Sequence, residues 1–183
     1  MSVDKRKYKK IPARMLSLAA MFAAFTLVAL YMSLVLPNMK FTFYFLSSVF
    51  ITGILIEGMT GMAVVMYIAV SGISLIILPI PYALPYIILF GHYGIGKYIF
   101  ETRLRSKAAA FIGKLIYFDI ALTGIYFAVI YTGLLPMAGI FESIPVWAWA
   151  LIAQPVFFIY DFIYSKAAGL YVNTVRSRIV RSS

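Results

Sequence analysis

Ionisable side chains inside apolar stretches are the residues of this sequence with the clearest chemical potential. Asp119, His92 and Asp161 each lie within a long apolar run, and His92 is the single histidine of the chain. A carboxylate at the centre of a bilayer costs about 2.5–3.5 kcal/mol on insertion scales, so it needs a partner or a protonated state. Candidate partners for Asp119 are His92, Lys114 and tyrosine hydroxyls. These residues are typical of a ligand site or a proton path, and equally of hydrogen-bonded core groups.

Neutral polar side chains extend this pattern as stripes at helical spacing. The stripes are Tyr44, Ser48 and Thr52; Tyr67, Ser71 and Ser74; Asp119, Thr123 and Tyr126; and Gln154, Asp161 and Ser165. Because polar groups at membrane depth face protein or water, one polar face per helix predicts a helix bundle with a hydrogen-bonded interior. Interhelical packing bonds worth ~0.6 kcal/mol each account for most of the serines and threonines.

Motifs for group transfer are missing from the sequence. There is no cysteine, no GxxxxGK[ST] phosphate-binding loop, no HExxH and no GxSxG, and the glycines of the segment 91–97, GHYGIGK, have a different spacing. We therefore expect no catalytic residues, no metal and no cofactor, and a protein that is not an enzyme. With no nucleotide site, the chain would not hydrolyse ATP itself.

The elements that must position these residues are membrane-spanning helices. The sequence is 63% hydrophobic and 12% charged, whereas a soluble domain carries about 25% charged residues. The run 14–36 is long enough to cross a hydrocarbon core of ~30 Å. We predict an all-α integral membrane protein, a bundle of six transmembrane helices spanning residues 14–172 between basic tails at 1–13 and 173–183. The expected spans are residues 14–36, 41–57, 62–78, 82–100, 109–131 and 146–171.

Basic residues gather in three clusters beside the apolar runs, at residues 5–14, 97–114 and 166–181. With six spans, every cluster falls on one side, so the positive-inside rule predicts that the N- and C-termini are both cytoplasmic. The net charge of +10 therefore indicates topology and contact with the lipid bilayer, not nucleic acid. Glu57 and Lys97 lie near cytoplasmic helix ends, where their side chains would snorkel to the interface.

The first span carries Ala19, Ala20, Ala23 and Ala24, two interleaved pairs of small residues that would let another helix approach closely. With its six spans, basic start and Ala-xxx-Ala patch, the chain resembles the substrate-binding S component of energy-coupling factor (ECF) transporters. The resemblance implies a six-helix bundle in the plasma membrane of a prokaryotic cell. It also implies that the alanines, as Ala19 and Ala23 or as Ala20 and Ala24, contact a membrane coupling subunit that partner ATPase subunits drive.

The resemblance further implies a small-molecule site in the outward-facing half of the bundle, for a vitamin-like or other micronutrient substrate. Aromatic walls with a few polar groups suit a small organic ligand. The candidate lining residues are Asn38, Lys40, Tyr44, Tyr86, His92, Asp119, Tyr126, Trp147 and Gln154.

Two other functions fit the same residues. The first is a self-sufficient small transporter or channel in which Asp119, His92 and Asp161 relay protons or bind a cation. The second is a six-span structural or assembly partner in a larger membrane complex, with a bundle interior filled by side chains and no ligand.

Overall fold

The computed structural model describes residues 13–132 and 146–176, and within these ranges the chain is helical apart from short turns. The long helices are α1 (Ala13–Val35), α2 (Lys40–Ile56), α3 (Thr60–Ile77), α5 (Gly91–Arg103), α6 (Lys107–Thr132) and α8 (Val146–Leu170). Short segments join or extend them, namely η2 (Pro37–Met39), α4 (Ile80–Pro85), η3 (Tyr86–Phe90) and η4 (Tyr171–Arg176). The all-α prediction is confirmed for this part of the chain.

Four helical segments are long and apolar enough to cross a membrane: Met15–Val35, Pro37–Ile56, Thr60–Ile77 and Lys107–Ala128. They coincide with the first, second, third and fifth predicted spans. The fourth predicted span is the interrupted run α4–η3–α5, and the sixth is α8, whose helical backbone continues through η4 to Arg176. The chain thus has the character of a membrane protein, and the count of six spans stays a prediction.

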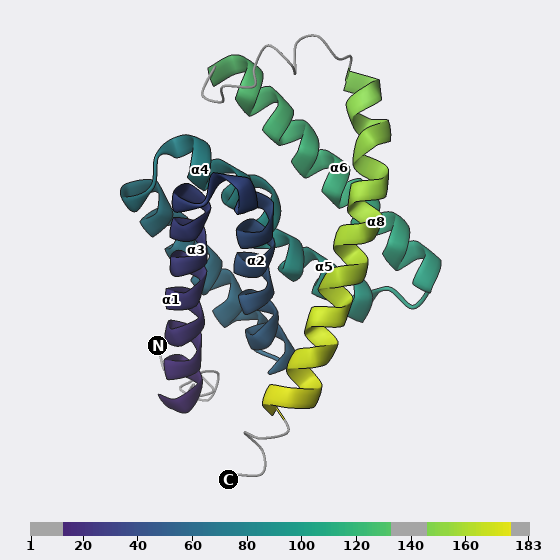
Figure 1. Ribbon diagram of the computed structural model, residues 1–183. Helices are drawn as coiled ribbons and strands as arrows, with labels where there is room; N and C mark the ends of the chain where they lie inside the picture. The colour runs from purple at the N-terminus through teal and green to yellow at the C-terminus, as the bar shows by residue number, and fades with distance from the viewer. Residues whose placement is uncertain (1–12, 133–145, 177–183) are drawn as a thin grey trace, which may run out of the picture.

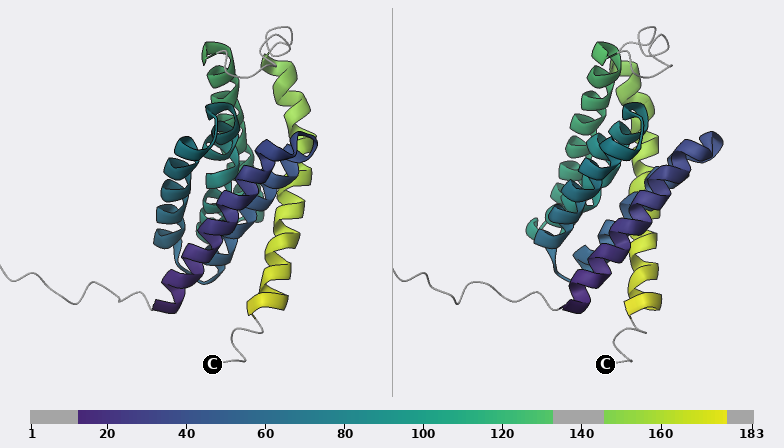
Figure 2. Two further views of the ribbon diagram at one scale, coloured as in Figure 1. Left: turned by 60° about the vertical axis from the view of Figure 1, so that its left-hand side comes forward. Right: turned by 90° about the vertical axis from the view of Figure 1, so that its left-hand side faces the viewer.

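Successive helices reverse direction, so the start of α1 and the end of α8 lie at the same end of the bundle (Figure 2). We call this the lower end. α1, α2 and α3 pack side by side, and α8 passes across α6 and reaches α2 (Figure 1). Gly58, in the lower turn between α2 and α3, has a φ of +77°, a conformation in which a side chain would be strained.

Proline placement explains why the fourth span is interrupted. Pro79 and Pro81 stand at the start of α4, where a missing N–H is harmless. Pro85 lies at its last position, and a proline inside a helix removes one backbone hydrogen bond. The next turn, η3, is π-helical, and such turns are frequent at functional sites. The run then continues without a break into α5.

The core is aromatic and centres on α5, which packs against α2, α3 and α6. The largest fully buried side chains are Tyr86, Tyr93, Tyr164 and Phe157. Three of these four carry a hydroxyl, which must find a hydrogen-bond partner inside the bundle. This requirement makes the position of each tyrosine informative about function.

Candidate functional site

Three glycines of α5 give tyrosines from neighbouring helices room to approach its backbone. A Cβ atom at Gly91 would lie 2.8 Å from ring carbons of Tyr67 and Tyr86, and one at Gly96 would lie 2.6 Å from the Tyr117 ring. A Cβ atom at Gly94 would collide with the Tyr164 hydroxyl. The segment Gly91–Lys97 is therefore not a phosphate loop but a surface of helix backbone on which tyrosine side chains rest.

A cluster of four charges joins α5, α6 and α8 near the lower end of the bundle. The Asp161 carboxylate accepts hydrogen bonds from Lys97 Nζ at 2.5 Å, Lys114 Nζ at 2.8 Å and the Tyr93 hydroxyl at 2.7 Å. Lys114 Nζ also pairs with Glu101 Oε1 at 2.9 Å, and Lys97 Nζ lies 3.5 Å from the same oxygen. We call Lys97, Glu101, Lys114 and Asp161 the four-charge cluster.

This cluster is neutral and closed. Two lysines face two carboxylates, and the lysine side chains are 7% and 8% exposed, whereas Glu101 is 46% exposed. The Ser165 hydroxyl accepts a further hydrogen bond from Lys97, at 2.7 Å. A buried ion pair is tolerated when further hydrogen bonds satisfy its remaining donors and acceptors. Since its groups satisfy one another, the cluster has the character of a structural tie.

The structure corrects two interpretations of these residues. Lys97 does not snorkel to the interface, because its side chain is buried and paired with Asp161. Lys114 does not pair with Asp119 on its own helix; it pairs with Asp161 of α8 and with Glu101. The carboxylate with three strong donors is therefore Asp161, not the more central Asp119.

A second polar group lies higher on α5, around His92. The Tyr117 hydroxyl and His92 Nδ1 are hydrogen-bonded at 2.8 Å, and Nε2 contacts the carbonyl of Ile88. A carbonyl only accepts, so Nε2 carries a proton, whereas a hydroxyl both donates and accepts and can therefore bond to Nδ1 with or without a proton on that nitrogen. His92 thus has both ring nitrogens engaged.

The rings of Tyr67 and Tyr86 extend this group towards α3 and η3. Tyr67 lies edge-on to His92, with ring centroids 6.0 Å apart, and its centroid is 6.2 Å from that of Tyr86. Tyr67 donates to the carbonyl of Ile87 at 2.7 Å. Tyr86 differs, because its hydroxyl is fully buried and has no hydrogen-bond partner among the described residues. We call Tyr67, Tyr86, His92 and Tyr117 the tyrosine–histidine group.

Asp119 and Gln154 form a separate contact between α6 and α8. Gln154 Nε2 donates to the two Asp119 carboxylate oxygens at 3.2 and 3.4 Å. The sequence placed both residues among the candidates, and the structure brings these two together. Asp119, His92 and Asp161, the predicted relay, have their described contacts in three different groups.

The candidates from the start of α2 form another contact. The Tyr44 hydroxyl donates to the carbonyl of Tyr82 at 2.9 Å, and Lys40 Nζ lies 4.7 Å from the centre of the Tyr82 ring. Asn38 is exposed in η2. These residues hold the upper ends of α2 and α4 together. Tyr126 is partly buried on α6, and the side chain of Trp147 lies outside the described part of the chain.

The four alanines of α1 divide into two faces. Ala19 is 5% exposed and belongs to the core, and Ala23 packs against that core. Ala20 and Ala24 are exposed. The predicted partner interface therefore narrows to Ala20 and Ala24, because the Ala19 face is already covered by helices of this chain.

Sequence reasoning missed the packing of tyrosine side chains against the glycines of α5. It also missed the pairing of Lys97 with Asp161. The glycine spacing in Gly91–Lys97 carried a signal for the first, since glycines inside an apolar helix mark close approach. Within the described residues, no group of three or more His, Asp or Glu side chains is placed to hold a metal ion. No family model matches the chain, and no curated protein or solved structure matches it either.

Proposed function

We propose that this protein is a membrane-embedded binding subunit for a small organic solute, and that the tyrosine–histidine group forms part of its site. The observation that carries the proposal is the fully buried Tyr86 hydroxyl, which has no hydrogen-bond partner among the described residues. Leaving a buried hydroxyl unpaired costs about 1–3 kcal/mol, so such a group calls for an explanation. A ligand that accepts this hydrogen bond supplies one.

The surroundings of Tyr86 suit an uncharged ligand with an aromatic or flat shape. Tyr67 and His92 offer ring edges and faces, and the charges of the four-charge cluster are paired with one another. Apolar aromatic walls with a few polar groups are typical of small-molecule sites. Because Tyr86 is fully buried, ligand access requires a local movement, for which the π-helical turn η3 is the suitable place.

In this proposal the chain depends on partners for energy. It lacks a nucleotide-binding motif, so an ATPase pair and a membrane coupling subunit would drive import, as in the ECF transporters that it resembles. The exposed Ala20 and Ala24 of α1 are the surface proposed for the coupling subunit. In this proposal the lower end, which carries Arg103, Arg105 and Lys107, faces the cytoplasm, as the positive-inside rule predicts. The resemblance to ECF transporters supports a prokaryotic plasma membrane.

Native mass spectrometry of the protein purified from its own membrane tests the binding function. The wild type is expected to retain a small molecule that Tyr86→Phe loses. Tyr160→Phe is the matched control, because the Tyr160 hydroxyl donates to Ser48 at 3.1 Å and so has its partner within the protein. Wild-type protein that carries no small molecule, or Tyr86→Phe that retains it fully, would contradict the proposal.

Copurification tests the partner surface separately. Ala20→Leu together with Ala24→Leu should release a coupling subunit and its ATPases, since larger side chains prevent close helix contact. Val28→Leu is the matched control on an exposed position of the same helix. An intact complex with both leucines present would exclude this surface.

A structural role in a larger membrane complex is the second candidate function. The observation that favours it is the closed four-charge cluster, which stabilises one helix arrangement and offers no free charge to a ligand. A protein subunit copurifying without any small molecule would support this function over solute binding.

A further inference from the structure

α8 meets the rest of the bundle along one face. Phe157, Tyr160 and Tyr164 are buried there, with Asp161 between them. The remaining faces of the same stretch carry large exposed apolar side chains, namely Val156, Phe158, Ile159, Phe162 and Ile163. The helix is thus attached by a single row of residues, and its other faces suit contact with lipid.

The strongest of these attachments lie in the lower half of α8. Asp161 joins α8 to Lys97 of α5 and to Lys114 of α6. Tyr160 and Tyr164 add hydrogen bonds to Ser48 of α2, at 3.1 and 3.3 Å. Hydrogen bonds between charged groups are about twice as strong as neutral ones, so Asp161 dominates this set.

Pro155 separates this lower half from the upper attachment. Just above it, Gln154 contacts Asp119 at 3.2 Å. A proline inside a helix removes one backbone hydrogen bond, and helices bend most readily at such positions. Pro155, which lies between the two attachments, is therefore a candidate hinge.

We propose that the four-charge cluster is a latch that holds the lower half of α8 against α5 and α6, with Pro155 as the hinge about which that half moves when the latch opens. The cluster holds α8 by ionic contacts, in addition to the apolar packing of its buried face. Without Asp161, two buried lysines face each other with the half-exposed Glu101 as their remaining partner. Their repulsion and the cost of burying an unpaired charge then favour movement of α8 away from them.

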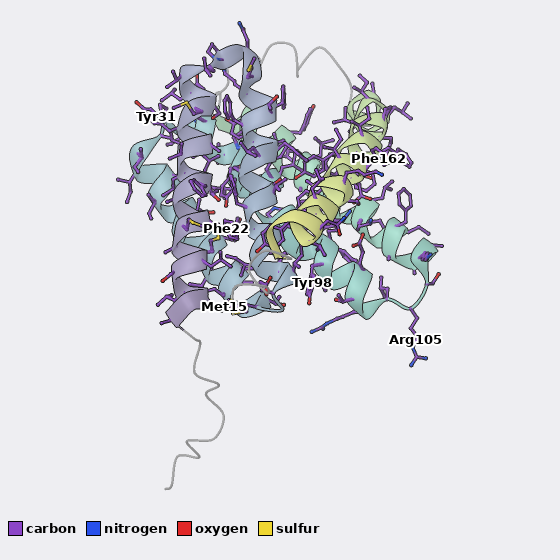
Figure 3. The ribbon with its side chains drawn as sticks, turned by 60° about the horizontal axis from the view of Figure 1, so that its bottom comes forward. Met15, Phe22, Tyr31, Tyr98, Arg105 and Phe162 are labelled. Atoms are coloured by element: carbon purple, nitrogen blue, oxygen red, sulfur yellow. The ribbon has the colours of Figure 1, made fainter. Side chains whose placement is uncertain are left out.

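The open state would expose the lower interior of the bundle at the end that carries the basic turn between α5 and α6. Figure 3 views the molecule with this lower end turned forward, and Arg105 points away from the helices there. The proposal does not depend on the identity of a ligand or on solute binding at all. Its failure would leave the proposed function untouched, and the reverse also holds.

Distances between spin labels on α8 and α3 test the latch, and the chain has no cysteine of its own. The lower pair is Lys166→Cys with Gly61→Cys, and the upper pair is Ile152→Cys with Ile76→Cys, all at exposed positions. In lipid nanodiscs, double electron–electron resonance should give a single distance for each labelled pair in the wild-type background. Asp161→Asn should add a longer-distance population to the lower pair and leave the upper pair unchanged.

Two further variants keep the test decisive. Tyr93→Phe retains all four charges and removes one donor to Asp161, so it should lengthen the lower-pair distance by less than Asp161→Asn does. If Asp161→Asn does not fold, the distance measured in Tyr93→Phe tests the latch. Thr102→Ala is the control, because its exposed hydroxyl bonds the carbonyl of Tyr98 on its own helix. Unchanged lower-pair distances in both Asp161→Asn and Tyr93→Phe would overturn the latch. A shift of both pairs together would overturn the hinge.

Discussion

The four-charge cluster and the tyrosine–histidine group both include residues of α5 and α6, yet they differ in how their polar atoms are satisfied. Around Asp161, each carboxylate oxygen receives at least one charged donor from another helix. Around His92, both imidazole nitrogens have a hydrogen-bond partner, but the Tyr86 hydroxyl of the same group has none among the described residues. A saturated group stabilises one structure, whereas an unsaturated buried group marks a place where something else can bind.

The largest expected effect tests how strongly the stability of the protein depends on the mutual pairing in the four-charge cluster. Asp161→Ala removes the shared acceptor of two buried lysines, and we expect a loss of about 3–5 kcal/mol in the free energy of unfolding. Reversible unfolding in bicelles, followed by circular dichroism, measures it. Lys97→Met with Asp161→Leu should cost less than Asp161→Ala alone, because it leaves Lys114 paired with Glu101. A double variant that is the less stable of the two would show that the cluster is not a self-contained ionic unit.

The next effect concerns α5, which contributes residues to both regions. Gly94→Ala would place a methyl group against the Tyr164 hydroxyl, and overpacking of this kind costs about 1–3 kcal/mol. Gly72→Ala on α3 is the matched control, since nothing lies within 4 Å of its Cβ position and alanine favours helix by about 1 kcal/mol. Thermal unfolding midpoints should fall for the first and hold or rise for the second. Equal midpoints would mean that Tyr164 does not rest on Gly94.

Tyr93→Phe tests the hydrogen bond that Tyr93 donates to the four-charge cluster, and its expected effect is similar in size to that of Gly94→Ala. It removes a hydrogen bond to the Asp161 carboxylate, which is 2.7 Å long, and bonds to charged groups contribute about 1.5–3 kcal/mol. Unfolding in bicelles should show a loss in that range. An unchanged free energy of unfolding would indicate that the two lysines alone satisfy Asp161.

Tyr86→Phe should give the smallest change in stability and the clearest change in binding. The hydroxyl has no partner among the described residues, so its removal is expected to alter the free energy of unfolding by less than about 0.5 kcal/mol or to stabilise the protein. The same unfolding measurement, beside that of Tyr93→Phe, makes the comparison. A loss of about 2 kcal/mol from Tyr86→Phe would instead point to a buried structural water on this hydroxyl.

The sequence predicted the helices better than the contacts. Apolar length and charge placement located the helical runs around Met15–Val35, Thr60–Ile77 and Lys107–Ala128. The proline-rich start of the fourth run was also visible, although its division into α4, η3 and α5 was not. The candidate site was only partly predictable. His92 and Tyr86 were both among the predicted lining residues, and the Tyr67 ring contacts each of them. Lys97 was interpreted as an interfacial residue, whereas it is buried.

What the sequence determined by itself is the membrane character of the chain and its helical class, because both follow from local composition and hydrophobic length. It also offered two equivalent alanine pairs on α1, and it could not choose between them. Only the tertiary structure buried Ala19 and left Ala20 exposed. It alone paired Lys97 with Asp161 across 64 positions of sequence and left the Tyr86 hydroxyl without a partner in the described ranges 13–132 and 146–176. Such partners depend on which helix faces pack together, and that choice is made by the whole bundle at once.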